Sequence, residues 1–438
     1  MVVREVDVII AGGGPGGSTA AYHLAVRGKR VLVIEKSAFP REKVCGDGLT
    51  PRAVKALHHL GLDTTGPEWA RSEGLRIIGA GHTLELPWPE LNGWPGYALV
   101  RARLDLDELL LRHAEKAGAT VWTETEVVDP ILDPDGVVIG VRCRSVQSPD
   151  DDQPSLFDGH AKRGRVRGEI LEVRAPVVIA ADGVANRFGQ ALGIRRIEKR
   201  PMGVAVRTYF RSPRASDNYL ESYLELWRGD DLLPGYGWIF PTPDGTVNIG
   251  LGLLNSSAHF QQVDYRGLLT DWVANLPPDW ELDRDNQVGQ IRGAGLPMGF
   301  NRTALAKPGL MLIGDAAGAV NPFNGEGIAY AMETGELAAG AAIEALASGS
   351  PHALRVYPDR LKETYEGYFI LGRAFVRLIG EPKVMRFLTQ HGLKRRDLMR
   401  FAFKVLANLA EPRRGDSHDR LFNAMVKVAP TINKVVGI

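Results

Sequence analysis

The chain has 438 residues, 44% of them hydrophobic and 24% charged, which suits two or three packed domains. No stretch of about 18 uninterrupted apolar residues occurs, so no bilayer-spanning helix is predicted, and Arg4, Glu5 and Asp7 argue against a signal peptide. The two cysteines, Cys45 and Cys143, fit a reducing cytoplasm and offer no metal-site spacing.

The N-terminal residues predict a strand, a glycine-rich turn, a helix and a second strand. An apolar run over 6–11 precedes the glycine-rich residues 12–17, and residues 18–26 have the composition of a helix. A second apolar run over 31–34 then ends on Glu35. This order is that of a dinucleotide-binding βαβ unit.

Each part of the turn has a physical role in holding a pyrophosphate. Gly12 permits the turn, Gly14 lets the backbone approach the phosphates, and Gly17 lets the helix pack on the strand. The helix N-terminus attracts the anion because its N–H groups are unpaired. Glu35 can accept hydrogen bonds from both hydroxyls of an adenosine ribose. The predicted contacts here are Gly12, Gly14, Pro15, Gly17, Glu35 and Lys36.

The next segments alternate between helices and strands. Helices are predicted over 51–60 and 104–118. Strand-like runs over 127–132 and 137–145 flank an Asp-Pro-Asp-Gly turn, which predicts a hairpin. The polar stretch 147–168 is predicted to be an exposed, mobile loop.

Two later strand-to-helix turns identify the dinucleotide. The first carries Asp182, and the second is an apolar strand that ends at Asp315. The loop after Asp315 leads through Gly325, Gly327 and Ile328 into a long Ala-rich helix. A carboxylate at a strand end, followed by a helix N-terminus, suits a ribityl chain and an isoalloxazine carbonyl. Helix capping would account for Asp315 alone but not for the set.

Together with the glycine turn, these sites resemble the FAD-binding pattern of the glutathione-reductase-type flavoproteins. The resemblance implies an α/β fold: a Rossmann FAD-binding domain, an inserted mainly β substrate domain rich in strand formers, and a helical C-terminal region that is broken at Glu381-Pro382. The expected division is 1–65, 97–195 and 300–347 for FAD, 66–96 and 196–299 for the substrate sheet, and 348–438 for the helices.

Two further motifs resemble those of the geranylgeranyl reductase family, flavoenzymes that saturate isoprenoid double bonds. The family's P-x-x-Y-x-C-G matches residues 40–46, except that Lys43 replaces the Tyr. Its Y-x-W-x-F-P, followed by G-x-G, matches 236–241 and 250–252 in full. The resemblance implies a substrate site at Tyr236, Trp238, Phe240, Gly250 and Gly252.

The residues themselves support this reading. Alternate residues of a strand share one face, so the three aromatic rings can line a dry cavity that packs a prenyl chain and tolerates positive charge. Ordinary sheet core is the alternative. Cys45 is a candidate proton donor or alkene-positioning group, and with Gly46 a predicted flavin contact; a small buried hydrophobe is the alternative for Cys45. Arg103 matches the family arginine near the flavin, or else is a solvated helix-start charge, and Cys143 is expected to be structural.

The net charge of +1 is unevenly distributed. Residues 383–438 carry 12 Lys/Arg and 4 Asp/Glu, or +8, which leaves −7 elsewhere. Arg396, Arg400 and Lys404 fall on one helical stripe beside apolar faces. This pattern is typical of a helix on an anionic membrane surface, or of a terminal helix that docks its apolar side on the protein. Nucleic acid is not expected as a partner, because no stacking aromatic set accompanies the charges.

The sequence thus predicts an FAD-dependent reductase of a polyprenyl C=C bond, on the cytoplasmic side of the cell membrane. The stretch from Cys45 to Pro51 and the basic tail most resemble the bacterial menaquinone reductases, which act on one isoprene unit. The alternatives are a geranylgeranyl lipid or diphosphate reductase, a flavin-dependent monooxygenase or halogenase, and a non-catalytic prenyl-binding carrier. No second dinucleotide fingerprint is present, so the electron donor, either NAD(P)H or a redox protein, stays open.

Overall fold

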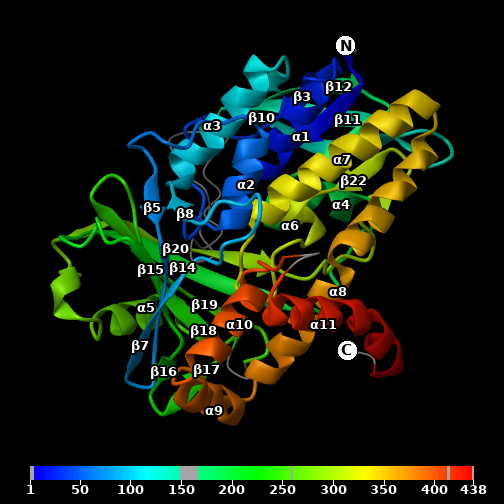
Figure 1. The fold of residues 1–438 in the computed structure, drawn as a ribbon. Helices are drawn as coiled ribbons and strands as arrows, with labels where there is room; N and C mark the ends of the chain where they lie inside the picture. The colour runs from blue at the N-terminus through cyan, green and yellow to red at the C-terminus, as the bar shows by residue number, and fades with distance from the viewer. Residues whose placement is uncertain (1–3, 148–165, 258–259, 412–414, 437–438) are drawn as a thin grey trace.

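The computed structural model describes residues 4–147, 166–257, 260–411 and 415–436. The glycine-rich turn belongs to a mostly parallel six-stranded sheet (Figure 1). In spatial order its strands are β21 (Ala306–Lys307), β22 (Leu310–Leu312), β13 (Val177–Ala180), β2 (Val8–Ala11), β3 (Val31–Ile34) and β9 (Thr120–Trp122). β21 runs antiparallel to β22. β2, β3 and β13 are buried at every position, as expected for parallel strands covered on both faces.

Helices cover one face of this sheet and a second sheet covers the other. The helices are α1 (Pro15–Ala25), α2 (Pro51–His59), α3 (Arg103–Lys116) and α7 (Ile328–Ser348). The covering sheet has the order β1 (Arg4–Glu5), β12 (Val166–Arg174), β11 (Val138–Gln147) and β10 (Thr125–Leu132). Two apolar cores fill the spaces between these layers, one on each side of the parallel sheet. Two short helices, α4 (Arg187–Ala191) and α6 (Gly314–Ala317), and a 3-10 turn (Gly183–Ala185) follow the ends of β13 and β22.

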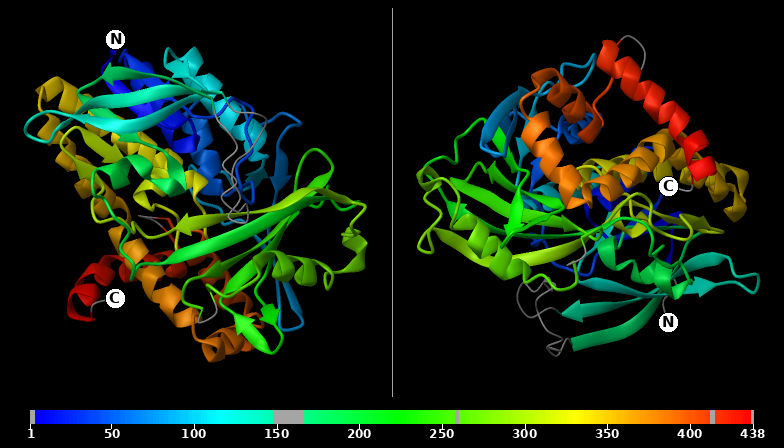
Figure 2. Two further views of the ribbon diagram at one scale, coloured as in Figure 1. Left: turned by 180° about the vertical axis from the view of Figure 1, so that it is seen from behind. Right: turned by 90° about the horizontal axis from the view of Figure 1, so that it is seen from below.

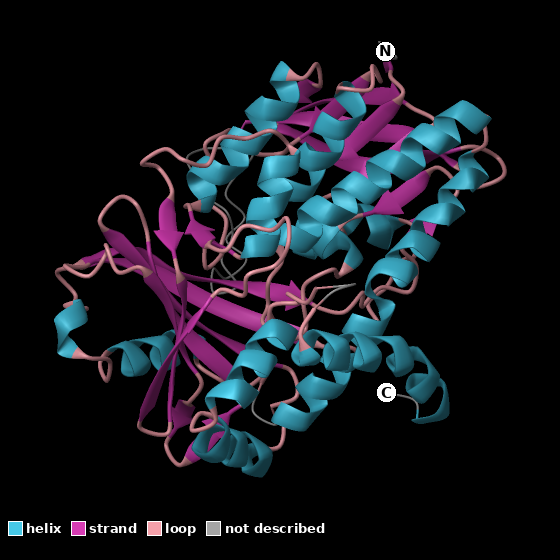
Figure 3. Ribbon diagram, in the orientation of Figure 1, coloured by secondary structure: helices cyan, strands magenta, loops and turns pink. Residues whose placement is uncertain are grey.

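A seven-stranded sheet forms the other half of the molecule (Figures 1 and 3). Its order is β20 (Gln287–Pro297), β14 (Met202–Arg211), β19 (Thr246–Leu254), β18 (Gly235–Pro241), β15 (Tyr219–Tyr223), β6 (Gly74–Gly79) and β7 (His82–Pro87). α5 (Tyr265–Val273) and a 3-10 turn (Pro278–Trp280) pack their apolar residues on its outer face. Two small sheets are β4 (Gly48–Leu49), β8 (Ala98–Val100) and β5 (Ala70–Ser72), and β16 (Leu226–Arg228) with β17 (Asp231–Leu233).

The C-terminal region is helical (Figure 2). After a 3-10 turn (Pro351–Arg355) it contains α8 (Val356–Ile379), α9 (Pro382–Gly392), α10 (Arg396–Leu406) and α11 (Ser417–Val436). The predicted break at Glu381-Pro382 separates α8 from α9. Among the described residues, no helix has the length and apolar character needed to cross a membrane.

Only part of the basic stripe predicted on α10 is exposed to solvent. The Lys404 ammonium pairs at 2.9 Å with both Asp416 and Asp419, which lie at the start of α11 and just before it. Lys404 therefore joins two helices and does not belong to an exposed stripe. Arg396 and Arg400 are exposed.

The α/β architecture is as predicted, and so is the hairpin, because β10 and β11 pair antiparallel around the Asp-Pro-Asp-Gly turn. The prediction of a loop over 147–168 was wrong at both of its ends. β11 extends through Gln147 and β12 begins at Val166, where the two strands pair; residues 148–165 lie outside the described part. The division into three domains remains a prediction.

Candidate active site

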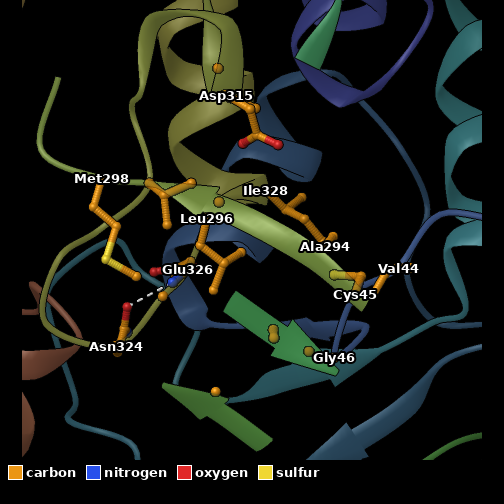
Figure 4. Close-up of a pocket in the computed structure, with 18 of the residues that line it drawn as sticks. Val44, Cys45, Gly46, Ala294, Leu296, Met298, Asp315, Asn324, Glu326 and Ile328 are labelled. Atoms are coloured by element: carbon orange, nitrogen blue, oxygen red, sulfur yellow. Dashed lines mark hydrogen bonds between the residues drawn. The ribbon is translucent and has the colours of Figure 1, made fainter. Parts of the chain in front are cut away.

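A cavity of about 640 Å³ runs from the glycine-rich turn to α9 and α10. It lies between the carboxyl ends of the parallel strands and the inner face of the seven-stranded sheet, and Figure 4 shows its central part. The residues predicted to contact FAD all line it: Gly12, Gly14, Pro15, Gly17, Glu35, Lys36, Cys45, Gly46, Arg103, Asp182, Asp315, Gly325, Gly327 and Ile328. Of the predicted substrate residues, Tyr236, Trp238, Phe240 and Gly252 line the same cavity.

The glycine turn presents bare backbone to this cavity. Gly12 has a φ of +114°, and a Cβ there would overlap the carbonyl oxygen of Ala181. A Cβ at Gly17 would overlap the carbonyl oxygen of Gly12, so this glycine lets α1 start against β2. A Cβ at Gly14 would meet just one group within 4 Å among the described residues, the Arg41 guanidinium at 3.4 Å. A tight turn, close packing and one open position fit the binding of a pyrophosphate.

Glu35 is fixed beside this turn at the end of β3. Its Oε2 accepts a hydrogen bond of 2.8 Å from the Gly13 N–H, and its Oε1 accepts one of 3.1 Å from the Ser37 N–H. The carboxylate is 5% exposed. Each carboxylate oxygen can accept a second hydrogen bond, so the group can still bind ribose hydroxyls.

The two predicted aspartates are placed differently. Figure 4 shows the Asp315 carboxylate pointing into the cavity from α6. The Oδ2 of Asp182 instead accepts a hydrogen bond of 3.0 Å from the Phe188 N–H in α4. Asp182 therefore holds a local turn, whereas the Asp315 carboxylate faces the cavity. Lys43, which replaces the family's Tyr, also lines the cavity; burial lowers its pKa, and the charge of Asp315 opposes this effect.

Arg103 is buried at the first position of α3, so it is not a solvated helix-start charge. Its Nε and Nη2 donate to the Asp107 carboxylate at 2.6 and 2.7 Å. The Arg41 Nη2 lies 3.0 Å from the same carboxylate. Burial favours a higher pKa for Asp107, but the two guanidinium charges outweigh it and hold that pKa below its usual value. The cluster presents positive charge to the cavity.

The Cys45 thiol lies beside this cluster and faces the cavity (Figure 4). Burial raises its pKa, the charge of Arg103 opposes this effect, and the carboxylate of Asp47 adds to it. The thiol is therefore protonated at neutral pH. Cys143 is fully buried in β11 within a core, where burial raises its pKa to about 11, as befits a structural residue.

A buried polar network ties the Cys45 loop to the seven-stranded sheet. The Asn248 Nδ2 donates to the Cys45 carbonyl at 2.8 Å and to the Asp47 carboxylate at 2.7 Å, and its Oδ1 accepts from the Trp238 Nε1 at 2.9 Å. The Tyr209 hydroxyl also donates to Asp47, at 2.6 Å. Burial raises the pKa of Asp47 to about 6, although hydrogen bonds from Tyr209 and Asn248 oppose this rise. The network fixes the distance between the cysteine loop and the aromatic strand.

The aromatic strand β18 has the predicted arrangement. Tyr236, Trp238 and Phe240 all face the cavity, with successive ring centroids 6.0 and 6.3 Å apart. The Tyr236 hydroxyl donates at 2.6 Å to the carbonyl of Asn324 in the loop before α7. The rings therefore form one apolar wall, and the Tyr236 end of this wall contacts the loop before α7.

The glycines of the G-x-G motif lie across from this wall. In the antiparallel pair β18–β19, Trp238 is opposite Gly250 and Tyr236 is opposite Gly252. A Cβ at Gly250 would overlap the Trp238 indole, whereas a Cβ at Gly252 would have no neighbour nearer than 3.8 Å. Gly250 thus makes room for an aromatic ring, and Gly252 is the member that lines the cavity.

Glu326 is a buried acid in the loop before α7 that the sequence reading did not single out. Its Oε1 accepts a hydrogen bond from the Thr50 hydroxyl, and its Oε2 has no hydrogen-bond partner among the described residues. Burial raises its pKa to about 7; Thr50 and the charge of Arg52 oppose this rise, and Glu333 adds to it. Glu326 therefore titrates near neutral pH.

Sequence reasoning also missed Asp47, Tyr209 and Asn248. Asn248 carried a usable indication, because it is a polar residue within the apolar strand 246–254 and would be buried there. Nothing in the spacing of Asp47 and Tyr209 links them, since they are 162 residues apart and meet only through the fold.

The comparisons with known proteins agree with this geometry. The FAD binding domain family matches residues 5–363. A menaquinone reductase of Mycobacterium tuberculosis is 37% identical, over 92% of this chain and 91% of its own. A digeranylgeranylglycerophospholipid reductase of Methanosarcina acetivorans is 33% identical, over 82% and 79%.

A solved structure has a similar fold: that of a geranylgeranyl bacteriochlorophyll reductase-like protein of Thermoplasma acidophilum, with a TM-score of 0.72. It is 24% identical and covers 100% of this chain and 99% of its own. These findings confirm the predicted cofactor, FAD, and the predicted fold class. The chain belongs to the FAD binding domain family and, within it, to the flavin-dependent reductases that include the menaquinone and digeranylgeranylglycerophospholipid reductases.

Proposed function

We propose that the protein uses FAD to reduce a C=C bond of a polyprenyl chain, and that it saturates one isoprene unit of menaquinone. The observation that carries this proposal is the network through Asn248. It links Cys45, beside the FAD-binding turns, to Trp238 on the aromatic wall. A prenyl chain packed along that wall brings its alkene to the thiol.

Alkene reduction requires a hydride at one carbon and a proton at the other. Reduced FAD supplies the hydride when it is bound. Cys45 donates the proton from its Sγ, and Arg103 stabilises the thiolate that remains until solvent reprotonates it. The aromatic rings of β18 exclude water and tolerate the positive charge that develops on the alkene.

The FAD contacts follow from the placement of the side chains. We assign the pyrophosphate to the glycine turn and the N-terminus of α1, and the adenosine ribose to Glu35. Asp315 is assigned the ribityl chain, because its carboxylate faces the cavity. The backbone of 325–328 is assigned the isoalloxazine carbonyl, because these residues end at the N-terminus of α7.

Menaquinone is preferred as the substrate because the menaquinone reductase relative covers 92% of this chain. A geranylgeranyl lipid is the second candidate, supported by the lipid reductase at 33% identity. The reductase relatives and the cavity-facing Cys45 argue against a monooxygenase or halogenase. The complete FAD-binding set argues against a non-catalytic prenyl carrier.

A quinone with a long prenyl tail resides in the bilayer, so we place the protein in the cytoplasm, bound peripherally to the inner face of the cell membrane. The electron donor is NAD(P)H or a redox protein. The test is to express the protein in cells that contain unsaturated menaquinone and archaeal-type lipid, and to measure both by mass spectrometry. A gain of two hydrogens in menaquinone supports the proposal. A gain in the lipid alone favours the second candidate, and no change in either contradicts both.

A further inference from the structure

The lining of the cavity reaches exposed residues at two ends, which we take as its openings and which differ in character. Among its lining residues, those that are also exposed fall into two groups. Lys36, Ala185 and Arg187 lie at the glycine-turn end, where the adenosine of FAD is assigned. Leu388 on α9 and Leu398 on α10 lie at the other end, with 39% and 46% of their surface exposed. The second opening is therefore apolar and lies between two helices.

The helices around this opening line the cavity with one face each. On α9 the lining residues recur at helical spacing, at Met385, Leu388, Thr389 and Gly392. On α10 the lining face runs from Leu398 to Leu406. An apolar path thus continues from the aromatic wall to the surface between α9 and α10. In Figure 1 these helices lie at the end of the molecule opposite the α1–β3 unit.

The surface around this opening carries both apolar and basic side chains. Phe387 on α9 is 60% exposed, the highest value among the exposed large hydrophobic residues of the described chain. Residues 382–400 contain one acidic residue, Asp397. Their exposed basic side chains are Lys383, Arg386, Lys394, Arg395, Arg396 and Arg400. Apolar groups within a basic ring match the interface of an anionic bilayer.

We propose that α9 and α10 form the membrane-docking surface of the protein, which rests on an anionic leaflet so that a prenyl lipid passes directly from the bilayer between Leu388 and Leu398 into the cavity. This inference rests on the proposed function, because a membrane-resident substrate is what the apolar opening admits. This surface replaces the membrane-binding stripe of Arg396, Arg400 and Lys404 that the sequence predicted. Lys404 cannot belong to it because its ammonium pairs with Asp416 and Asp419.

The test measures sedimentation of the FAD-loaded protein with vesicles of phosphatidylglycerol and phosphatidylcholine, and with vesicles of phosphatidylcholine alone. Two variants probe the surface without touching the cavity lining: Phe387→Ser, and the triple change Lys394→Glu, Arg395→Glu and Arg396→Glu. Each has a matched control elsewhere. Val26→Ser changes a side chain that is 51% exposed on the first βαβ unit, and Lys116→Glu, Lys199→Glu and Arg211→Glu make the same charge change on other surfaces.

We expect the wild-type protein to bind the anionic vesicles, with binding that weakens as salt is added. The triple variant should bind them about tenfold less tightly or worse, because each basic residue near an anionic surface contributes. Phe387→Ser should also weaken binding, while both controls bind like wild type. All variants should keep their FAD content, melting temperature and activity on a short, soluble prenyl substrate.

Three results would overturn the docking surface: equal vesicle binding by the variants and wild type, equal losses in the controls, or loss of a dimer in Phe387→Ser without any vesicle binding. The last would make α9 an interface between copies of the chain. The proposed function fails separately, because vesicle binding is measured without turnover. Docking that depends on α9 and α10, with no reduction of menaquinone in detergent, would retain the surface and reject the substrate.

Discussion

Trp238 and Gly250 lie opposite each other across β18 and β19, and the indole occupies the space that a side chain at Gly250 would need. The Trp238 Nε1 then reaches Asn248, two residues before the glycine on the same strand. The position of the Trp238 indole thus depends on the absence of a side chain at Gly250 and on the buried amide of Asn248. This relationship explains why the Y-x-W-x-F-P and G-x-G parts of the motif occur together.

Gly250→Ala should therefore displace the indole. Overpacking of this kind lowers the unfolding free energy by roughly 1–3 kcal/mol. The hydrogen bond from the Trp238 Nε1 to Asn248 would also be lost. Unfolding in urea, followed by tryptophan fluorescence, measures both effects. Gly252→Ala is the matched control, since its Cβ would meet its nearest neighbours at 3.8 and 3.9 Å and should change stability little. Equal stability of the two variants would contradict the packing explanation.

Asp315→Ala should weaken the retention of FAD more than Asp182→Ala does. The Asp315 carboxylate faces the cavity, whereas Asp182 accepts a hydrogen bond from the Phe188 N–H. Asp182→Ala should instead lower the melting temperature of the protein. Acid release of the flavin, its identification by chromatography and thermal unfolding separate the two effects. Bound FMN, or equal FAD loss in both variants, would be incompatible with the assignment.

Cys45→Ser should keep the fold and the bound FAD but lose most alkene reduction. A serine hydroxyl is a far weaker acid than a thiol, and the site otherwise keeps its hydrogen bonds, since Asn248 contacts the Cys45 carbonyl. Cys143→Ala, a change in the core at a residue that does not line the cavity, should retain activity and lose only modest stability. Product formation under excess reductant measures the difference. Wild-type activity in Cys45→Ser would show that Cys45 is not the proton donor and has a structural role.

Glu326 should make stability depend on pH, because burial raises its folded-state pKa from 4.5 to about 7. Between these values the folded protein holds a proton that the unfolded chain has released. The contribution of this group is therefore most favourable below pH 4.5, falls as the pH rises to 7, and is constant above that. The total change is about 3 kcal/mol.

Glu326→Gln keeps the neutral form at every pH. The variant should match wild type in acid and exceed it in unfolding free energy by about 3 kcal/mol at neutral pH. Reversible urea unfolding of the FAD-loaded proteins across this range measures the difference. Glu198→Gln, a change at an exposed glutamate, should not reproduce the pattern. A difference between Glu326→Gln and wild type that is independent of pH would show that folding leaves the pKa of Glu326 unshifted.

The local parts of this protein could be predicted from its amino-acid sequence. The glycines of the first turn and the apolar runs that flank it predict a βαβ unit because backbone conformation and burial are properties of short segments. The alternation of Tyr236, Trp238 and Phe240 likewise predicted a shared face, since the side-chain period of a strand is two. The family motifs then led to FAD and to a prenyl substrate.

Which of these parts lie in contact could not be predicted, because it depends on long-range packing. Asp47 and Tyr209 form a hydrogen bond across 162 positions, and Asn248 joins Cys45 to the aromatic wall. The sequence left Arg103 open as a solvated charge and placed Lys404 on a basic stripe. In the structure Arg103 is buried against Asp107, and Lys404 is paired between two helices. Charge is visible in a sequence, but whether a charge is hydrated or paired depends on the neighbours that long-range packing brings to it.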